Sequence, residues 1–308
     1  MNKRTRKSLL SLLILLIVGA ITTYFFWPDQ ATLLTPRVIT SKTFGEHLIV
    51  AAGDIAEKGG DQAKTAALVR SLHPEKVLTL GDTVYESGTA AEFKEFYEPT
   101  WGAFKNITAP TVGNHEYKTP GAAGYYDYFG NLAGPDRRGY YSYDLGAWHL
   151  ISLNSEVINK KQLDWLVQDL GATDKKCILA YWHEPLFSSG NEHGNNPLMR
   201  VFWERLYAQG TDIILNGHDH DYERFAKQNP QGRADPRGIR EFVAGTGGGD
   251  QRGFVPAEAT TEVRTTGVPG VLQLTLRDGS YDAEFKSVEG STFTDKISEQ
   301  KCNGQKEK

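Results

Sequence analysis

The sequence predicts an α/β fold in which strands and helices alternate along the chain and stack in layers. Short apolar runs, of the length expected for buried strands, recur from residue 47 to residue 244. Stretches with helical spacing of apolar residues lie between several of these runs. Polar side chains follow the runs, and such an alternation is typical of a layered α/β domain.

The apolar runs define the expected strands in chain order. They cover residues 47–52, 77–80, 109–112, 148–153, 177–182, 212–215 and 241–244. Further along, residues 271–276 and 281–285 flank the turn sequence Arg277-Asp278-Gly279-Ser280. This arrangement predicts a β-hairpin that closes the domain.

Three helices are expected from apolar spacing and from residues that start and stop helices. The first covers 63–72 and follows Asp61, a candidate cap. The second covers 160–170, between a capping Asn159 and Gly171, and the third covers 198–209 before Gly210.

The N-terminal residues 1–27 are expected to be an export element. A basic cluster at residues 3–7 precedes about twenty uncharged residues that end at Trp27, a length that just spans a bilayer core. The alternative is a cleaved signal peptide, because Val18-Gly19-Ala20 is similar to a small-residue cleavage site. Both interpretations place the rest of the chain outside the cytoplasm, either membrane-anchored or secreted.

The rest of the chain is expected to hold one domain. Residues 28–44 are interpreted as a linker, 45–290 as the folded domain and 291–308 as a C-terminal tail. The chain has two cysteines, Cys177 and Cys302. In an oxidising compartment they could form a disulfide, and otherwise they are two unpaired thiols.

The charge balance argues against nucleic acid as a partner. The chain has a formal charge of −4, and without its four N-terminal basic residues it has 30 basic against 38 acidic residues. A domain this acidic lacks the cationic surface that grips nucleic-acid phosphates. An anionic substrate would therefore have to be held by metal.

Five motifs, each at the carboxyl end of an expected strand, carry most of the functional information. They are Gly53-Asp54-Ile55-Ala56, Gly81-Asp82-Thr83-Val84-Tyr85, Gly113-Asn114-His115-Glu116, Tyr181-Trp182-His183 and Gly217-His218-Asp219-His220. Ligand sites of α/β sheets gather at the carboxyl ends of strands, so we expect these side chains to converge. Two carboxylates, a phenol, an amide and several imidazoles can hold two metal ions that share a bridging carboxylate.

These motifs resemble those of the calcineurin-like metallophosphoesterases, and among them the purple acid phosphatases. The first motif has no histidine after Asp54, and the second ends in Tyr85, an exchange that is similar to the purple acid phosphatases. Ala56 stands where the family usually has glycine. The resemblance implies a layered β-sandwich of mixed sheets flanked by helices, with residues 45–290 as the catalytic domain.

The resemblance also implies a role for each site residue. Its seven metal ligands are Asp54, Tyr85 and His220 on Fe(III), Asp82 as the bridge, and Asn114, His183 and His218 on a divalent ion, Fe, Zn or Mn. His115 is expected to donate a proton to the leaving group or to contact phosphate, with Glu116 orienting it. His193 is expected to line the substrate side.

The function implied is an exported phosphatase that acts on a small phosphorylated substrate. Phosphate monoesters would be hydrolysed by in-line attack of a metal-bound hydroxide. Two alternatives stay open: a phosphodiesterase acting on nucleotides or lipid headgroups, and a non-catalytic surface protein that keeps its metal for structure.

Overall fold

Two mixed β-sheets form the centre of the computed structural model, which describes residues 45–304. The first sheet has the order β13-β12-β11-β1-β2-β3, in which β1, β2 and β3 are parallel. Its strands are β1 (His47–Ala52), β2 (Lys76–Leu80), β3 (Thr108–Thr111), β11 (Gly270–Arg277), β12 (Ser280–Ser287) and β13 (Thr294–Lys301).

The second sheet has the order β10-β8-β9-β7-β6-β5-β4, and β5, β6, β7 and β9 run parallel within it. Its strands are β4 (Tyr141–Leu145), β5 (Trp148–Ser152), β6 (Cys177–Tyr181), β7 (Ile213–Asn216), β8 (Tyr222–Phe225), β9 (Arg240–Ala244) and β10 (Thr261–Thr265).

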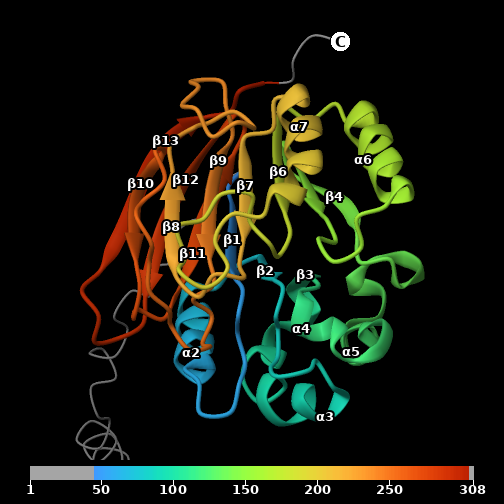
Figure 1. Ribbon diagram of the computed structural model, residues 1–308, viewed down its shortest axis with the longest axis vertical. Helices are drawn as coiled ribbons and strands as arrows, with labels where there is room; N and C mark the ends of the chain where they lie inside the picture. Colours follow the sequence, from blue (N-terminus) through green and yellow to red (C-terminus); the bar gives the residue numbers. More distant parts are fainter. Residues whose placement is uncertain (1–44, 305–308) are drawn as a thin grey trace, which may run out of the picture. The chain divides into compact units, whose positions relative to one another are not determined.

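Helices cover the outer faces of both sheets. They are α2 (Gln62–Leu72), α3 (Ala90–Glu92), α4 (Asn114–Tyr117), α5 (Ala123–Phe129), α6 (Lys160–Ala172) and α7 (Arg200–Gln209). Short helical turns are Phe93–Tyr97, Trp101–Ile107, Pro120–Ala122, Gly130–Ala133, Pro135–Arg137 and Pro197–Met199. Figure 1 shows α6 and α7 side by side, close to β6 and β4, and α3, α4 and α5 gathered beyond β2 and β3.

Apolar side chains fill the space between the sheets. Ile49 and Leu80 from the first sheet and Leu179 and Leu215 from the second are all fully buried in one cluster. Separate clusters lie under the helices on the two outer faces. The predicted fold class, two mixed sheets in layers with flanking helices, is confirmed.

The ends of the sheets differ from the sequence expectation. Residues 294–301, expected in a C-terminal tail, form β13, which pairs with the predicted hairpin through β12. Its side chains are mostly polar and exposed, so it carries no apolar run that would reveal an edge strand. Similarly, α6 continues through Gly171 to Ala172.

A disulfide joins Cys177, the first residue of β6, to Cys302, which directly follows β13. The Cα atoms are 5.5 Å apart, and the bond closes a loop with a sequence separation of 125. Since β6 and β13 belong to different sheets, the disulfide ties the two sheets together.

The expected export element at 1–27 and linker at 28–44 lie outside the described residues. Between residues 45 and 304, no helix has both the length and the apolar character needed to cross a bilayer.

The two sheets meet at the carboxyl ends of their parallel strands. The main-chain N–H of Gly53, after β1, donates to the carbonyl of Ala244 at the end of β9 (2.9 Å), and the N–H of Gly247 donates to the Gly53 carbonyl (2.9 Å). The N–H of Asp54 donates to the Gly81 carbonyl after β2 (3.2 Å). These bonds fix the loops of the first two motifs against each other and against the loop after β9.

Candidate metal centre

One group of donor atoms comes from the loops after β1, β2 and β7. The Tyr85 hydroxyl donates to Asp54 Oδ1 at 2.8 Å and lies 2.9 Å from His220 Nε2. His220 Nε2 is 3.4 Å from Asp54 Oδ1. All three side chains are buried. A phenol, a carboxylate and an imidazole therefore face one another in a shared space.

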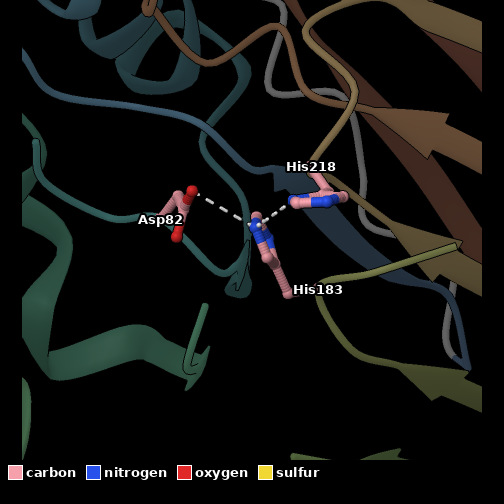
Figure 2. A group of neighbouring side chains, drawn as sticks. All are labelled: Asp82, His183 and His218. Carbon is pink, nitrogen blue, oxygen red and sulfur yellow. Dashed lines mark hydrogen bonds and ion pairs between the residues drawn. The ribbon is translucent and has the colours of Figure 1, made fainter. Parts of the chain in front are cut away.

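A second group lies beside the first and contains Asp82, Asn114, His183 and His218. His183 Nε2 is 3.2 Å from Asp82 Oδ2 and 3.0 Å from Asn114 Oδ1. The Nδ1 atom of His218 is 3.1 Å from the same nitrogen. Figure 2 shows Asp82, His183 and His218 pointing toward one another from three different loops.

The spacing within both groups fits metal coordination. Ligand atoms that share an ion at about 2.0–2.2 Å lie about 2.8–3.5 Å apart for right-angle or tetrahedral geometry. The distances among the Asp54, Tyr85 and His220 donors run from 2.8 to 3.4 Å, within that range. Phenolate and carboxylate oxygens suit a hard trivalent ion, whereas imidazoles and an amide suit a divalent one. The seven residues expected as ligands thus form two donor sets of the right chemistry.

Unusual backbone conformations aim three of these side chains. Asp54, Asp82 and His218 have positive φ angles of 58°, 42° and 74°. Such conformations are uncommon in residues other than glycine and cost of order 1–3 kcal/mol each. The neighbouring Gly113 is also required for space, since a Cβ there would lie 2.3 Å from Asp82 Oδ1.

The pKa values reflect crowded ionisable groups in a buried space. Burial raises the pKa of Asp54, and burial followed by the charge of Asp54 raises that of Tyr85. For Asp82 and His183 burial acts against ionisation, but their mutual attraction dominates, so the pKa of Asp82 falls and that of His183 rises. Burial and the neighbouring His183 lower the pKa of His218 to about 2. Cations would displace these shared protons, because metal ligands bind deprotonated.

Main-chain carbonyls orient two of the candidate imidazoles. His183 Nδ1 donates to the Leu80 carbonyl at the end of β2 (2.8 Å), and His220 Nδ1 donates to the Asp250 carbonyl (2.6 Å). A carbonyl can only accept, so each ring carries a proton on Nδ1, and the lone pair of a deprotonated Nε2 would face the site. Hydrogen bonds of this kind fix ring orientation at metal sites.

His115 lies at the edge of this centre. Its ring contacts Tyr85 edge-on, with centroids 4.5 Å apart, and its Nε2 is 3.9 Å from Asp82 Oδ2. The Lys118 ammonium lies 3.1 Å from His115 Nε2, and the imidazole is 16% exposed. The structure therefore places His115 next to both donor groups with access to solvent.

His193 lies over His218. The two rings stack with centroids 4.0 Å apart, at an angle of 24°. Arg252 Nη1 donates to His193 Nε2 at 3.0 Å. Burial lowers the pKa of His193 below the ordinary value of an imidazole. Sequence reasoning did not find Arg252 or Lys118, because both lie in loops without a recognisable spacing to the ligands.

Glu116 does not contact the His115 ring, and the expectation that it orients this imidazole is wrong. Its carboxylate accepts hydrogen bonds from the main-chain N–H groups of Thr83 (2.7 Å), Val84 (3.3 Å) and Gly113 (2.8 Å). Burial, then the charge of Asp82, raises its pKa to about 8. Glu116 instead holds the second and third motif loops together.

The fold and the two donor groups define a metallophosphoesterase-type site, and a family comparison agrees. The model of the calcineurin-like phosphoesterase family matches residues 47–222, more than half of the chain. The protein belongs to the calcineurin-like phosphoesterase family.

Individual relatives point to the purple acid phosphatases. The chain is 28% identical over 218 residues to purple acid phosphatase 15 of Arabidopsis thaliana, covering 58% of this chain and 41% of that protein. The purple acid phosphatase PPD1 of yellow lupin superposes with a TM-score of 0.67 at 18% identity, over 83% of this chain and 54% of that chain. The chain thus spans less than two thirds of these relatives.

A third similar structure has a different description. GAP50, described as the anchor in the inner membrane complex of Plasmodium, superposes with a TM-score of 0.65 at 14% identity, over 84% of this chain and 90% of that chain. At this identity the likeness concerns the fold alone.

Proposed function

We propose that the protein is a phosphatase that hydrolyses phosphate monoesters at a dinuclear centre of Fe(III) and a divalent ion, Fe, Zn or Mn. The observation that carries the proposal is the separation of seven donor residues into two adjacent sets of different hardness. The phenol, Asp54 and His220 would hold the trivalent ion, and Asn114, His183 and His218 the divalent one. Asp82 would bridge them.

Bound cations at these positions would neutralise phosphate oxygens and make a water molecule acidic enough to attack phosphorus. The chain's own residues would do the rest. His115, on the solvent side of the centre, donates a proton to the leaving oxygen. His193, held over His218, lines the substrate side of the site. Main-chain hydrogen bonds to the ligand imidazoles keep both donor sets in place as charge changes during the reaction.

The proposed location is outside the cytoplasm. The N-terminal sequence supports export, either as an anchor in the membrane or as a cleaved signal. The bond between Cys177 and Cys302 supports an oxidising compartment independently, because disulfides persist mainly there. Mass spectrometry of the N-terminus of mature protein separates the two forms.

The test is an assay of the full chain, purified with its metals, on an aryl phosphate monoester and on the matching diester. Rapid hydrolysis of the monoester with slow hydrolysis of the diester supports the proposal. Preferential hydrolysis of the diester would instead support the alternative function, a phosphodiesterase. If metal-loaded protein cleaves neither ester, the remaining alternative is a non-catalytic protein that keeps its metal for structure.

The metal assignment has its own test in Tyr85→Phe. Loss of the phenol removes the hard ligand of the trivalent site, so we expect the visible absorption band of an Fe(III)-tyrosinate to disappear. Tyr125→Phe is the matched control, because Tyr125 is also fully buried and its hydroxyl has no hydrogen-bond partner among residues 45–304. A band that survives in Tyr85→Phe contradicts the assignment.

A further inference from the structure

Arg252 is a cationic side chain next to both donor sets that none of the motifs contains. Its guanidinium Nη1 contacts His193, which stacks on His218 in the divalent set. Its main-chain N–H donates to the carbonyl of His220, in the trivalent set, at 3.1 Å. Arg252 is thus tied to both halves of the centre, and its head group lies beside the imidazole expected to line the substrate side.

Stability alone is a weak reason for a guanidinium in this place. Its carboxylate partners are Glu192 Oε2, at 2.9 Å from Nη1, and Asp250 Oδ1, at 3.5 Å from Nη2. The side chains of these two carboxylates are 54% and 63% exposed. Ion pairs with such exposed partners typically stabilise a protein by only about 0–1 kcal/mol. Water or another anion can therefore replace these contacts at little cost.

The chemistry of the guanidinium fits phosphate. Arginine carries five N–H donors in a planar fork that matches two oxygens of a phosphate group. Burial at 21% exposure strengthens a hydrogen bond to an anion compared with the same bond in open solvent.

Resting on the proposed function, we propose that Arg252 binds the third non-esterified oxygen of a phosphate monoester and so selects monoesters over diesters. A monoester has three non-esterified oxygens. Two of them would be neutralised by the metal pair, which leaves one for the guanidinium. In a diester the corresponding position is occupied by the second ester group, which has no charge and needs space. Arg252 is in this view a specificity-determining residue, and its loss lowers the activity on monoesters while the activity on diesters is largely kept.

Lys118 is a second cation next to the centre, but its position fits phosphate recognition less well than that of Arg252. Its side chain is 45% exposed and contacts His115, the proposed proton donor to the leaving group. A flexible ammonium in solvent is a poorer device for recognising one oxygen than a guanidinium held at two points.

The experiment compares wild type, Arg252→Ala and Arg252→Lys as full chains, with kcat/KM for the aryl monoester and the diester at pH 7. At that pH a phosphate monoester is largely a dianion, because its second pKa is about 6. We expect Arg252→Ala to lower kcat/KM for the monoester by on the order of 10- to 100-fold, the effect of losing a charge-assisted hydrogen bond. The value for the diester should change by less than about threefold, and Arg252→Lys should be intermediate for the monoester.

Arg277→Ala is the matched control. Arg277 also pairs with two carboxylates, Glu46 (2.6 Å) and Asp282 (2.9 Å), and is 31% exposed, but it lies at the β11–β12 turn. This variant should leave both kcat/KM values unchanged. Metal content and thermal midpoint of all variants are measured in parallel, to separate substrate contact from damage to the centre.

Binding of inorganic phosphate to metal-loaded protein, measured by calorimetry, tests the inference without turnover. Arg252→Ala should raise the Kd of phosphate by on the order of tenfold or more relative to wild type and Arg277→Ala. Equal losses for both esters, or unchanged phosphate binding, would overturn the role of Arg252. If wild type cleaves neither ester, the proposed function fails, and the phosphate measurement alone then decides the inference.

Discussion

At the scale of single residues, His115 differs from the seven candidate ligands in what its ring contacts. Its Nδ1 donates to the Glu86 carbonyl at 2.8 Å, and its Nε2 lies 3.1 Å from the Lys118 ammonium. The ring touches Tyr85 only along its edge, and the Asp82 carboxylate oxygen lies 3.9 Å from its Nε2. The closest polar contacts of the two ring nitrogens among the described residues are thus to Glu86 and Lys118, which belong to neither donor set.

His115→Ala should therefore separate catalysis from metal binding. We expect kcat to fall by about 10²–10³-fold, the usual contribution of a general acid, while the metal content stays at the wild-type level. Kinetics with the monoester and elemental analysis of the purified protein check both halves. His47→Ala serves as the control, since His47 pairs with Glu75 outside the centre. A variant that loses its metals would make His115 a ligand and contradict the assignment.

The sequence predicts single residues well where a motif fixes both the residue and its position after a strand. Asp54, Asp82 and His183 each lie two residues after the end of a buried strand, and the structure brings all three to one place. The positions of Arg252 and Asp250 cannot be predicted from the sequence, because they depend on the path of a loop after β9. The contacts of Glu116 cannot be predicted either, because three main-chain donors from two loops surround its carboxylate only in the folded chain.

At the scale of elements, burial on both faces decides which strands the sequence reveals. Every residue of β5, β6 and β9 is buried, and most of them are apolar, so these strands read as continuous runs. The sequence of β10, Thr-Glu-Val-Arg-Thr, and that of β13 are polar because these strands lie at the sheet edges. Their place comes from main-chain pairing with a neighbour, which leaves no signal in a single sequence.

Glu116 connects α4 to the loop after β2, and its removal should destabilise both. Glu116→Ala leaves three buried N–H groups without their acceptor, so we expect unfolding free energy to fall by about 2–4 kcal/mol, measured by urea denaturation. Glu92→Ala is the matched control, because Glu92 accepts from the N–H groups of Glu86, Ser87 and Thr89 but is partly exposed. Water can replace its carboxylate there. Equal losses in the two variants would mean that burial does not set the cost.

His149 links β5 to β4 and α6 and makes stability depend on pH. Its Nδ1 contacts Asp144 and its Nε2 contacts Asp169, each at 2.8 Å, and Lys175 lies 3.6 Å from Asp144. Burial acts to lower the pKa of His149, but the two carboxylates, Asp169 first, raise it above its ordinary value of 6.5. A pKa raised by folding stabilises the protein fully below the unfolded value, and this contribution is lost as pH rises through the folded value.

The measurement compares urea unfolding of wild type and His149→Gln at about pH 6 and at about pH 9. The free energy of unfolding of wild type should exceed that of the variant by more at the lower pH, because the imidazolium donates to both carboxylates there. An advantage of equal size at both pH values would show that His149 contributes by packing and not by charge.

At the scale of the whole molecule, the sequence pattern does not predict which of the two sheets each strand joins. β1, β2 and β3 join one sheet and β5, β6 and β7 the other, yet the runs of both sets look alike. The contact between the two sheets depends on hydrogen bonds between residues far apart in the chain, such as that from the Gly53 N–H to the Ala244 carbonyl. The expectation of two layered mixed sheets came from the resemblance of the motifs to a known family, and the periodicity of the chain does not predict it.

The disulfide between Cys177 and Cys302 should contribute stability without affecting the chemistry. It closes a loop with a sequence separation of 125 and ties the two sheets together, so its removal should lower the unfolding free energy by about 2–5 kcal/mol. Cys177 begins β6, whereas His183 follows the opposite end of that strand, and the centre should keep its metals and its activity in folded protein. Urea denaturation with and without a reducing agent measures the effect, and the double variant Cys177→Ala/Cys302→Ala is the control, since a reductant should not shift its midpoint. If reduction leaves the wild-type midpoint in place, the two sheets are held together by the packing of their shared core, and the covalent link adds nothing to it.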